Sequence, residues 1–367
     1  MLPPEINADL KRTVIGQAES LKFVSVAIFK HLQGEPFGNL MLIGSSGTGK
    51  TTIMRAVERF YAQHDEFQKY RIVVILNANT FANDEGVIDT SRLFVRLEER
   101  ARQLLGKNAD PTEIALHMQH ATVCLDEIDK VSSVVGGKPY VTGINIQQAL
   151  LTMIEGERID HDITVERDGK RVTETHHIDT SHMLFFCGGA FEALYDQVFK
   201  RVTSPTSRVK LPNETVIIDE RVEIREYFTL RHHFRQEDLF DYGMQPQFLA
   251  RFDNSIILED LNTNLLHQIF MMETDDSIFK ASQNFFKRYN VDLQITDDGA
   301  RRLAAEAAKS SRIGARALKG VYALVIKPFE FDPFSHDEVT KQGEGYLFTI
   351  DEDLVRRSLH KELTIPA

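Results

Sequence analysis

Eight residues near the start of the chain have the types and the spacing of a phosphate-binding loop. The segment from Gly44 to Thr51 matches the pattern G-x-x-x-x-G-K-S/T and follows an apolar run that predicts a strand. Its glycines let backbone N–H groups close around phosphate oxygens, and the positive end of the following helix attracts the same charge. We expect Lys50 to reach the β- and γ-phosphates of a nucleoside triphosphate and the Thr51 hydroxyl to hold Mg²⁺. The residues predicted to bind the nucleotide here are Gly44, Ser45, Ser46, Gly47, Thr48, Gly49, Lys50, Thr51 and Thr52.

A second chemical signal is a pair of adjacent acids, Asp126 and Glu127, at the end of an apolar run. Ligands of open α/β sheets bind just outside the carboxyl ends of the strands, so this placement suits triphosphate hydrolysis. We expect Asp126 to hold Mg²⁺ and Glu127 to orient or deprotonate the attacking water. The alternative is an acidic N-cap for the next helix, but the phosphate loop upstream favours the catalytic interpretation.

The surrounding patterns predict an α/β domain with a parallel sheet flanked by helices, followed by a smaller, mostly helical domain. Four apolar runs predict buried strands: 39–43, 71–76, 121–125 and 183–187. Apolar residues at helical spacing predict two helices within 5–35 and others from 51, at 91–105 and at 144–155. Beyond residue 255 the predicted elements are helices at 260–289, 296–310 and 315–327, and a short strand at 346–350. We therefore expect one domain over 1–253 and a second over 254–367.

Further stretches have the character of strands or loops. The charged sequence around Asp168-Gly169 is typical of a β-hairpin with a two-residue turn. Apolar residues at 216–218 and 222–224 predict strands within the 200–240 region, and Gly136 to Gly143 predict a loop. Four histidines lie in or near the hairpin: His161, His176, His177 and His182. Their spacing fits no zinc-ligand pattern, so we interpret them as solvated surface residues.

Length and composition bound the class of protein. The 367 residues suffice for two domains, at roughly 150 residues each. The net charge of −11 disfavours sequence-independent binding to nucleic acid, although a local basic patch stays open. No apolar run approaches the roughly 18 residues of a membrane span, and the first residues lack the layout of a signal peptide. Cys124 and Cys187 each lie in an apolar run, which predicts buried, reduced thiols in a cytoplasmic protein.

With these residues in view, the chain resembles the ATPase module of ClpX-type unfoldases, which are AAA+ ATPases of the Clp/HSP100 class. The resemblance extends from about residue 3 to 358. The segments that carry it, besides the phosphate loop, are Val14-Ile15-Gly16-Gln17, Leu125-Asp126-Glu127-Ile128-Asp129-Lys130, Gln147-Gln148-Ala149-Leu150-Leu151 with Ile154-Glu155-Gly156, 184–191, 242–251 and Gly314-Ala315-Arg316. The third and fourth of these are much more specific than a general ATPase signal.

The resemblance implies an AAA+ large domain, a helical lid domain with the nucleotide between the two, and ATP with Mg²⁺. Val14 and Ile15 resemble the family's contact to adenine. Arg251 resembles the arginine that reaches the neighbouring subunit's nucleotide, and Arg316 resembles the sensor arginine that acts on its own subunit's nucleotide. Cations at the transferring phosphate are what this chemistry needs. An arginine supplied in trans implies a homo-oligomeric ring, most often a hexamer.

The chain departs from the family pattern in three places. ClpX-type unfoldases begin with a Cys₄ zinc domain, whereas this chain leads almost directly into the ATPase module. No Gly-Phe pair occurs in the sequence, and residues 200–240 are unlike the family's loop that binds the Clp peptidase, so we do not expect that partner. The first pore loop offers only Val87 and Ile88 in place of an aromatic residue. Tyr140 and Val141 lie where the second pore loop should be, and Tyr140 is either a relocated gripping residue or an ordinary loop tyrosine.

These observations favour a ring-forming ATPase that remodels or unfolds protein substrates without the Clp peptidase. A second hypothesis is a nucleotide-gated switch or scaffold that clamps a dedicated partner protein, for example within a nucleic-acid or defence complex. Gripping side chains in the channel distinguish the two, because threading needs them and a switch does not. A small-molecule kinase also uses a phosphate loop, but the arginine motifs and the extra domain disfavour it.

Overall fold

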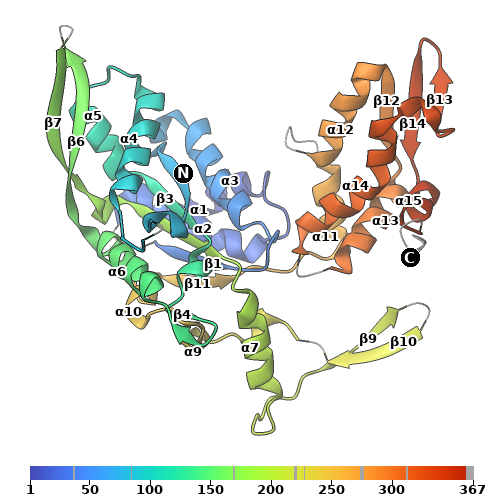
Figure 1. The fold of residues 1–367 in the computed structure, drawn as a ribbon, viewed down its shortest axis with the longest axis horizontal. Coiled ribbons are helices and arrows are strands. Elements are labelled where there is room, and N and C mark those ends of the chain that lie inside the picture. Colours follow the sequence, from blue (N-terminus) through green and yellow to red (C-terminus); the bar gives the residue numbers. More distant parts are fainter. Residues whose placement is uncertain are drawn as a thin grey trace. The chain divides into compact units, whose positions relative to one another are not determined.

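The computed structural model describes residues 1–35, 38–83, 85–167, 170–218, 221–226, 228–272, 277–310 and 313–360. The chain divides into two compact units: Met1–Gly44 with Lys50–Leu258, and Ser45–Gly49 with Glu259–Ala367. The first unit is an α/β structure, and the second is smaller and mostly helical (Figure 1).

A five-stranded sheet forms the centre of the first unit. Its strands lie in the order β11-β1-β8-β3-β2, and every neighbouring pair is parallel. Their bounds are β1 (Leu40–Ile43), β2 (Val73–Asn77), β3 (Thr122–Asp126), β8 (Leu184–Gly189) and β11 (Asn254–Ile257). A parallel sheet covered on both faces needs apolar side chains throughout, which explains why β1 and β8 are buried along their whole length. The predicted α/β fold with a parallel sheet is confirmed.

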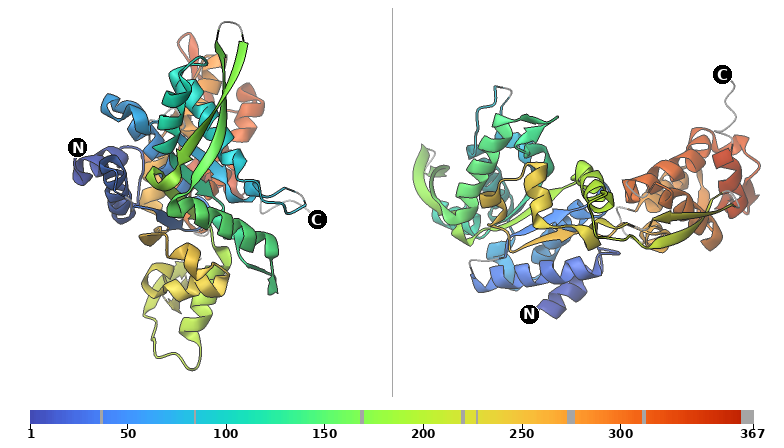
Figure 2. Two further views of the ribbon diagram at one scale, coloured as in Figure 1. Left: turned by 90° about the vertical axis from the view of Figure 1, so that its left-hand side faces the viewer. Right: turned by 90° about the horizontal axis from the view of Figure 1, so that it is seen from below.

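Helices cover both faces of this sheet (Figure 2). Successive side chains of a strand point to opposite faces, so Leu40 and Leu42 belong to one core cluster while Met41 and Ile43 belong to another. The helices that supply the first cluster are α1 (Pro3–Leu10), α2 (Ala18–Gln33) and α3 (Lys50–Gln63). Those that supply the second are α4 (Ser91–Leu105), α5 (Pro111–Gln119), α6 (Val141–Gly156), α7 (Glu192–Thr203), α9 (Gln236–Tyr242) and α10 (Pro246–Leu249).

The segment before α6 differs from the prediction of a loop from Gly136 to Gly143. β4 (Val134–Val135) and β5 (Lys138–Pro139) form a short antiparallel pair, and α6 begins at Val141. Gly136 and Gly137 make the two-residue turn between these strands with φ of +59° and +76°, a backbone conformation that glycine adopts without strain. The loop prediction was wrong because paired glycines mark a tight turn as well as an open loop.

A long antiparallel hairpin, β6 (Arg158–Arg167) and β7 (Lys170–Asp179), follows α6 and confirms the predicted strands. The predicted turn, Asp168-Gly169, lies outside the described residues. A second antiparallel pair, β9 (Asn213–Ile218) and β10 (Arg221–Glu226), matches the strands expected within 200–240. A single turn of helix, α8 (Leu230–His233), then leads towards α9.

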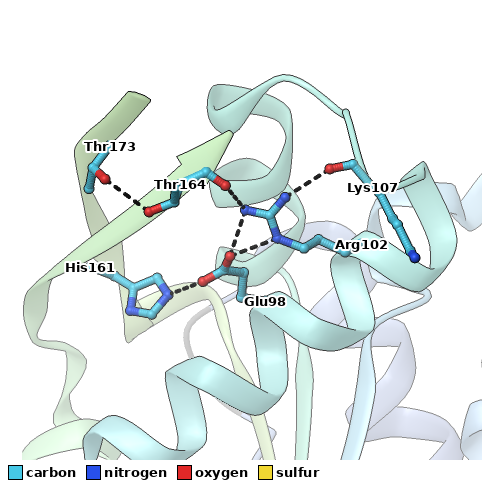
Figure 3. Close-up of polar contacts among 6 residues, drawn as sticks. All are labelled: Glu98, Arg102, Lys107, His161, Thr164 and Thr173. Carbon is cyan, nitrogen blue, oxygen red and sulfur yellow. Dashed lines mark hydrogen bonds and ion pairs between the residues drawn. The ribbon is translucent and has the colours of Figure 1, made fainter. Parts of the chain in front are cut away.

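A cluster of charged side chains holds the first hairpin on α4 (Figure 3). Glu98 accepts hydrogen bonds of 2.7 Å from both Arg102 and His161, and Arg102 also donates to the carbonyl oxygen of Thr164 at 2.7 Å. Burial alone would raise the pKa of the Glu98 carboxyl, but its bonds to His161 and Arg102 outweigh burial and lower that pKa. The His161 side chain is only 13% exposed, so its interpretation as a solvated residue was wrong. His176, at 19%, is also partly buried, in contrast to His177 at 75%.

The second unit has its own apolar core. In the part of this unit that the structure describes, a three-stranded sheet in the order β12-β14-β13 lies among five α-helices. The helices are α11 (Thr263–Met271), α12 (Ile278–Phe286), α13 (Asp297–Ala308), α14 (Ala315–Phe331) and α15 (Glu352–His360). The strands are β12 (Val291–Ile295), β13 (Val339–Gln342) and β14 (Gly345–Ile350), of which only the last was predicted. The helical character expected for this part of the chain is confirmed.

Both cysteines lie in the parallel sheet of the first unit. Cys124 and Cys187 are buried and unbridged, as predicted, and burial raises the pKa of each thiol well above its ordinary value. Among the described helices, none is long and apolar enough to cross a membrane.

Candidate functional site

The phosphate-loop sequence joins the end of β1 to the start of α3. The N–H of Gly44 donates to the carbonyl oxygen of Gly189 at 3.2 Å, which ties the start of the loop to the end of β8. Thr48 closes the loop on itself, since its hydroxyl donates to the carbonyl oxygen of Ser45 at 2.9 Å. Helix α3 then begins at Lys50, so its unpaired N–H groups and positive end follow the loop directly. This is the strand–loop–helix arrangement that the motif requires.

Thr51 and Asp126 meet although 75 residues separate them in sequence. The Thr51 hydroxyl donates to the Asp126 carboxylate at 2.8 Å, from the first turn of α3 to the carboxyl end of β3. A hydroxyl and a carboxylate are hard oxygen ligands of the kind that Mg²⁺ prefers. The pair therefore fits the metal ion that the sequence predicts.

Lys50 and Glu127 flank this pair. Lys50 is 8% exposed, and its ammonium group donates to the carbonyl oxygen of Gly44. Glu127 has an exposed side chain, and its backbone N–H donates to the Asp126 carboxylate at 2.9 Å. Its φ of +57° is left-handed, which costs a residue with a side chain about 1–2 kcal/mol. Such strain concentrates at functional sites, and here it turns the chain sharply just after β3.

The structure brings Thr51 and Asp126 into contact, next to Lys50 and Glu127 in the chain, and the other predicted nucleotide contacts differ in their exposure. Val14 is 4% exposed and belongs to the core under α1 and α2, and Ile15 beside it is partly exposed. Thr52 is exposed on the first turn of α3.

Two predicted arginines have partners of different kinds. Arg251 follows α10 in the first unit, and its guanidinium donates to the Glu155 carboxylate near the end of α6. Arg316 lies in the first turn of α14 and donates to the Ser46 hydroxyl. Next to it, the N–H of Ala315 donates to the carbonyl oxygen of Gly47 at 3.1 Å. Ser46 and Gly47 belong to the same unit as α14, so within this unit Arg316 contacts a loop side chain and Ala315 contacts the loop backbone.

The two segments predicted to line a pore lie side by side in the first unit. A Cβ atom placed on Gly86 would come within 3.0 Å of the Thr142 hydroxyl, just after Tyr140 and Val141. Val87 and Val141 are 57% and 63% exposed, and Tyr140 is 37% exposed. Ile88 contributes less surface, because it pairs with Ala82 and packs against the core.

Sequence reasoning missed two exposed apolar residues that lie near the second segment in the chain. Val134 and Val135, in β4, are 42% and 58% exposed and precede the same helix. The signal was an apolar pair directly before Gly136-Gly137, the two residues of the tight turn that joins β4 to β5. Exposed apolar side chains therefore occur on β4 as well as on the two predicted segments, and β4 pairs with β5, which ends directly before Tyr140.

Comparison with known proteins agrees with this geometry. A family model described as "AAA domain (Cdc48 subfamily)" matches residues 35–255. The chain is 28% identical over 381 residues to the ATP-dependent Clp protease ATP-binding subunit ClpX 2 of Wolinella succinogenes, an alignment that covers 96% of this chain and 83% of that protein. It is 25% identical over 347 residues to the ClpX subunit of Bacteroides thetaiotaomicron, with 90% and 77% covered. The ClpX subunit of Azotobacter vinelandii is 27% identical over 352 residues, with 90% and 74% covered.

Proposed function

This chain belongs to the AAA domain (Cdc48 subfamily) family, and from that premise we propose that it is a ring-forming ATPase that remodels or unfolds protein substrates without the Clp peptidase. The predictions of a ClpX-like AAA+ protein and of an ATPase are confirmed by the family match and the ClpX relatives. ATP-driven remodelling of proteins is what this family does in general. The ring, the independence from the peptidase and the residue roles below are the parts that we propose.

The contact between Thr51 and Asp126 is the observation that carries the proposal. Mg²⁺ held there would neutralise charge on the β- and γ-phosphates of ATP. In the proposed site the backbone from Gly44 to Thr52 cradles the phosphates, and Lys50 binds them through its ammonium group. Glu127 orients or deprotonates the attacking water, so it acts mainly in the transition state.

The remaining proposals assign residues to adenine binding and to charge stabilisation, and divide the chain into two domains. We assign adenine binding to Val14 and Ile15, and we assign stabilisation of the developing charge to Arg316 in its own subunit and to Arg251 in the neighbouring subunit. Residues 1–253 form the nucleotide-binding domain in this proposal, and residues 254–367 form the lid.

The exposed apolar side chains around Tyr140 support threading of a substrate chain. A channel that pulls a chain must hold side chains of any type, and an aromatic ring does so through apolar contact and shape. The alternative function, a nucleotide-gated switch that clamps a dedicated partner, is favoured by one observation. The first pore segment has no aromatic residue, and its Ile88 is partly buried.

The experiment that tests the proposal compares Glu127→Gln with wild type in three assays: ATP binding, ATP turnover and unfolding of a folded fluorescent protein. We expect Glu127→Gln to bind ATP normally and to lose both turnover and unfolding, because it changes the residue that acts on water. Glu113→Gln, on the exposed face of α5, is the matched control and should behave as wild type. Addition of a Clp peptidase should leave every rate unchanged. Wild-type turnover by Glu127→Gln would refute the assigned site, and unfolding by neither protein would favour the switch.

A further inference from the structure

Gln147 and Glu155 are two polar side chains of helix α6 to which the proposed chemistry gives no role. They lie eight residues apart, about 12 Å along the helix axis. Gln147 is fully buried, and Glu155 is 40% exposed. Each of them contacts the segment that leads to Arg251, the arginine assigned to the neighbouring subunit's site.

Gln147 fastens that segment from inside the protein. Its amide nitrogen donates to the carbonyl oxygens of Val131 and Gly243, at 2.8 and 3.1 Å, and its amide oxygen accepts from the N–H of Gln245 at 2.7 Å. A buried side-chain amide whose donors and acceptor are all used holds its partners in one arrangement. Gln147 therefore joins three pieces of chain: the stretch after Glu127, helix α6 and the stretch before Arg251.

Two further hydrogen bonds and a close approach at Gly243 hold the stretch after Glu127 against the stretch before Arg251. Ser132 donates to the carbonyl oxygen of Tyr242 at 2.8 Å, and the N–H of Ser133 donates to that of Gly243 at 2.8 Å. Gly243 has a φ of +107°, and a Cβ atom there would lie 2.3 Å from the Ser132 hydroxyl oxygen, so this position requires glycine. Helix α10 then starts at Pro246 and buries Phe248 and Leu249. The backbone that ends at Arg251 is therefore rigidly placed.

The Arg251 side chain itself is long and 46% exposed, so the rigid backbone alone does not fix its guanidinium. Glu155 supplies the missing restraint, because its carboxylate accepts from the Nη2 group of Arg251. Among the residues that the structure describes, Glu155 is the one side chain that pairs with this guanidinium. An exposed ion pair adds little stability, so stabilisation of the fold does not explain the contact. A guanidinium held through one nitrogen keeps its other N–H groups available for phosphate oxygens.

We propose that Glu155 is a positioning residue for Arg251, which orients the guanidinium before it reaches the nucleotide of a neighbouring subunit. This inference rests on the proposed function, because it requires a site completed in trans. Loss of the restraint lets the arginine sample other rotamers and so reduces the fraction of time in which it meets the developing charge.

The first test measures ATP turnover by three variants. Glu155→Ala should lower kcat about tenfold and leave KM for ATP unchanged, because the arginine acts in the transition state. Glu155→Gln keeps an acceptor oxygen at the same reach and should retain most of the activity. Glu99→Ala removes the carboxylate of another exposed ion pair, with Arg96 on α4, and should match wild type. Equal unfolding midpoints for all three would show that the fold is intact. A Glu155→Ala variant with normal kcat, or a Glu155→Gln variant as impaired as Glu155→Ala, would overturn the inference.

The second test asks in which subunit the defect acts. Glu155→Ala is mixed with an excess of Lys50→Ala, which is inactive but carries a correctly held Arg251. If Glu155 acts through Arg251 on the neighbouring subunit, turnover per Glu155→Ala subunit should rise in this mixture. It should approach the turnover per wild-type subunit when wild type is mixed with the same excess of Lys50→Ala. Arg251→Ala mixed with Lys50→Ala is the control for the shared site. Recovery of Arg251→Ala without recovery of Glu155→Ala would overturn the role of Glu155 alone, whereas recovery of neither would overturn the shared site and with it the proposed ring.

Discussion

The hydroxyl of Thr51 donates to the carboxylate of Asp126 across 2.8 Å, which joins the first turn of α3 to the carboxyl end of β3. The two oxygens come from different elements of the sheet and helix layers, so the contact depends on the whole first unit being folded. Single substitutions at this contact and at Lys50 beside it can therefore test the proposed metal and phosphate binding separately.

Thr51→Ala removes one proposed oxygen ligand of Mg²⁺ and leaves the loop and Lys50 in place. We expect the Mg²⁺ concentration at half-maximal ATP turnover to rise about tenfold, on the scale of a lost ligand or its immediate support. The measurement is a Mg²⁺ titration of the turnover rate. Thr203→Ala is the control and should not shift the curve, because Thr203 is exposed near the end of α7 and its hydroxyl donates to the carbonyl oxygen of Phe199 in the same helix. An unchanged midpoint for Thr51→Ala would show that its hydroxyl is not a ligand.

Lys50→Ala should abolish ATP binding, because its ammonium group meets phosphate charge in the ground state as well as in the transition state. The measurement is equilibrium binding of a fluorescent ATP analogue, with Lys107→Ala as a control in the loop after α4. Binding by Lys50→Ala with wild-type affinity would argue against the assigned phosphate contact.

Specific ATPase activity should rise with protein concentration and then reach a plateau, since a subunit without a neighbour lacks Arg251 in its site. Arg251→Ala should stay low at every concentration. The assay is turnover per subunit over a wide dilution series, with the oligomeric state followed by light scattering. A wild-type rate that does not depend on concentration, from a protein that remains monomeric, would favour a self-sufficient ATPase.

Tyr140→Ala should leave basal ATPase activity nearly unchanged and should remove its stimulation by a protein substrate, because the ring is proposed to grip the chain. Val87→Ala should weaken the same stimulation less, since valine presents less surface than tyrosine. Two assays are needed. The first compares ATPase rates in the presence and absence of the substrate, and the second follows the loss of fluorescence as a folded substrate is unfolded. If both variants keep full stimulation and unfolding, the nucleotide-gated switch becomes the better account.

His31 predicts how the stability of the first unit depends on pH. Burial lowers the pKa of His31 to about 3 from an ordinary value of 6.5. Its ring lies between the Tyr61 hydroxyl and the carbonyl oxygen of His182, each at 3.0 Å. The carbonyl oxygen needs a donor at Nε2, so in the neutral ring Nδ1 accepts from the hydroxyl. Between pH 6.5 and 3 the unfolded chain therefore binds a proton at this position that the folded protein does not.

The contribution of His31 to the free energy of unfolding should accordingly be complete above pH 6.5. Below pH 6.5 it should fall by about 1.4 kcal/mol per pH unit. Replacement by glutamine, which does not titrate, isolates this contribution. The free-energy difference of unfolding between wild type and His31→Gln should shift in favour of the variant as the pH falls from 6.5 to 4.5. Denaturant unfolding at several pH values measures it, and a difference that stays constant over this range would refute the argument.

The parts of the site that could be predicted are those formed by residues close together in the sequence. The phosphate loop, and the acids at the end of β3, each have a local pattern whose chemistry needs adjacent residues. Four of the five strands of the parallel sheet followed from apolar runs, because a sheet covered on both faces needs apolar side chains. The fifth, β11, was not predicted, since it is short and begins with the polar residues Asn254 and Ser255. Helix α5 was missed although it carries local signals, Asp110 as N-cap and Pro111 in its first turn.

Contacts between distant side chains could not be predicted in this way. Glu155 and Arg251 are 96 residues apart, and nothing in the neighbourhood of either one marks the other as its partner. His161 was assigned to the surface for the same reason, since its burial depends on Glu98, 63 residues earlier. Pairings of this kind follow from the packing of helices and strands, which a pattern of residue types specifies only in part.

The length of α6 has a consequence for how this chain can vary. Tyr140 stands directly before the helix and Glu155 one residue before its end, so the 16 residues of the helix set a separation of about 24 Å between its two ends. Insertion of a single residue between them would turn one end by about 100° and move it by about 1.5 Å relative to the other. We therefore expect functional relatives to differ in α6 by substitution but not by insertion or deletion, whereas the hairpin that follows is free to change in length.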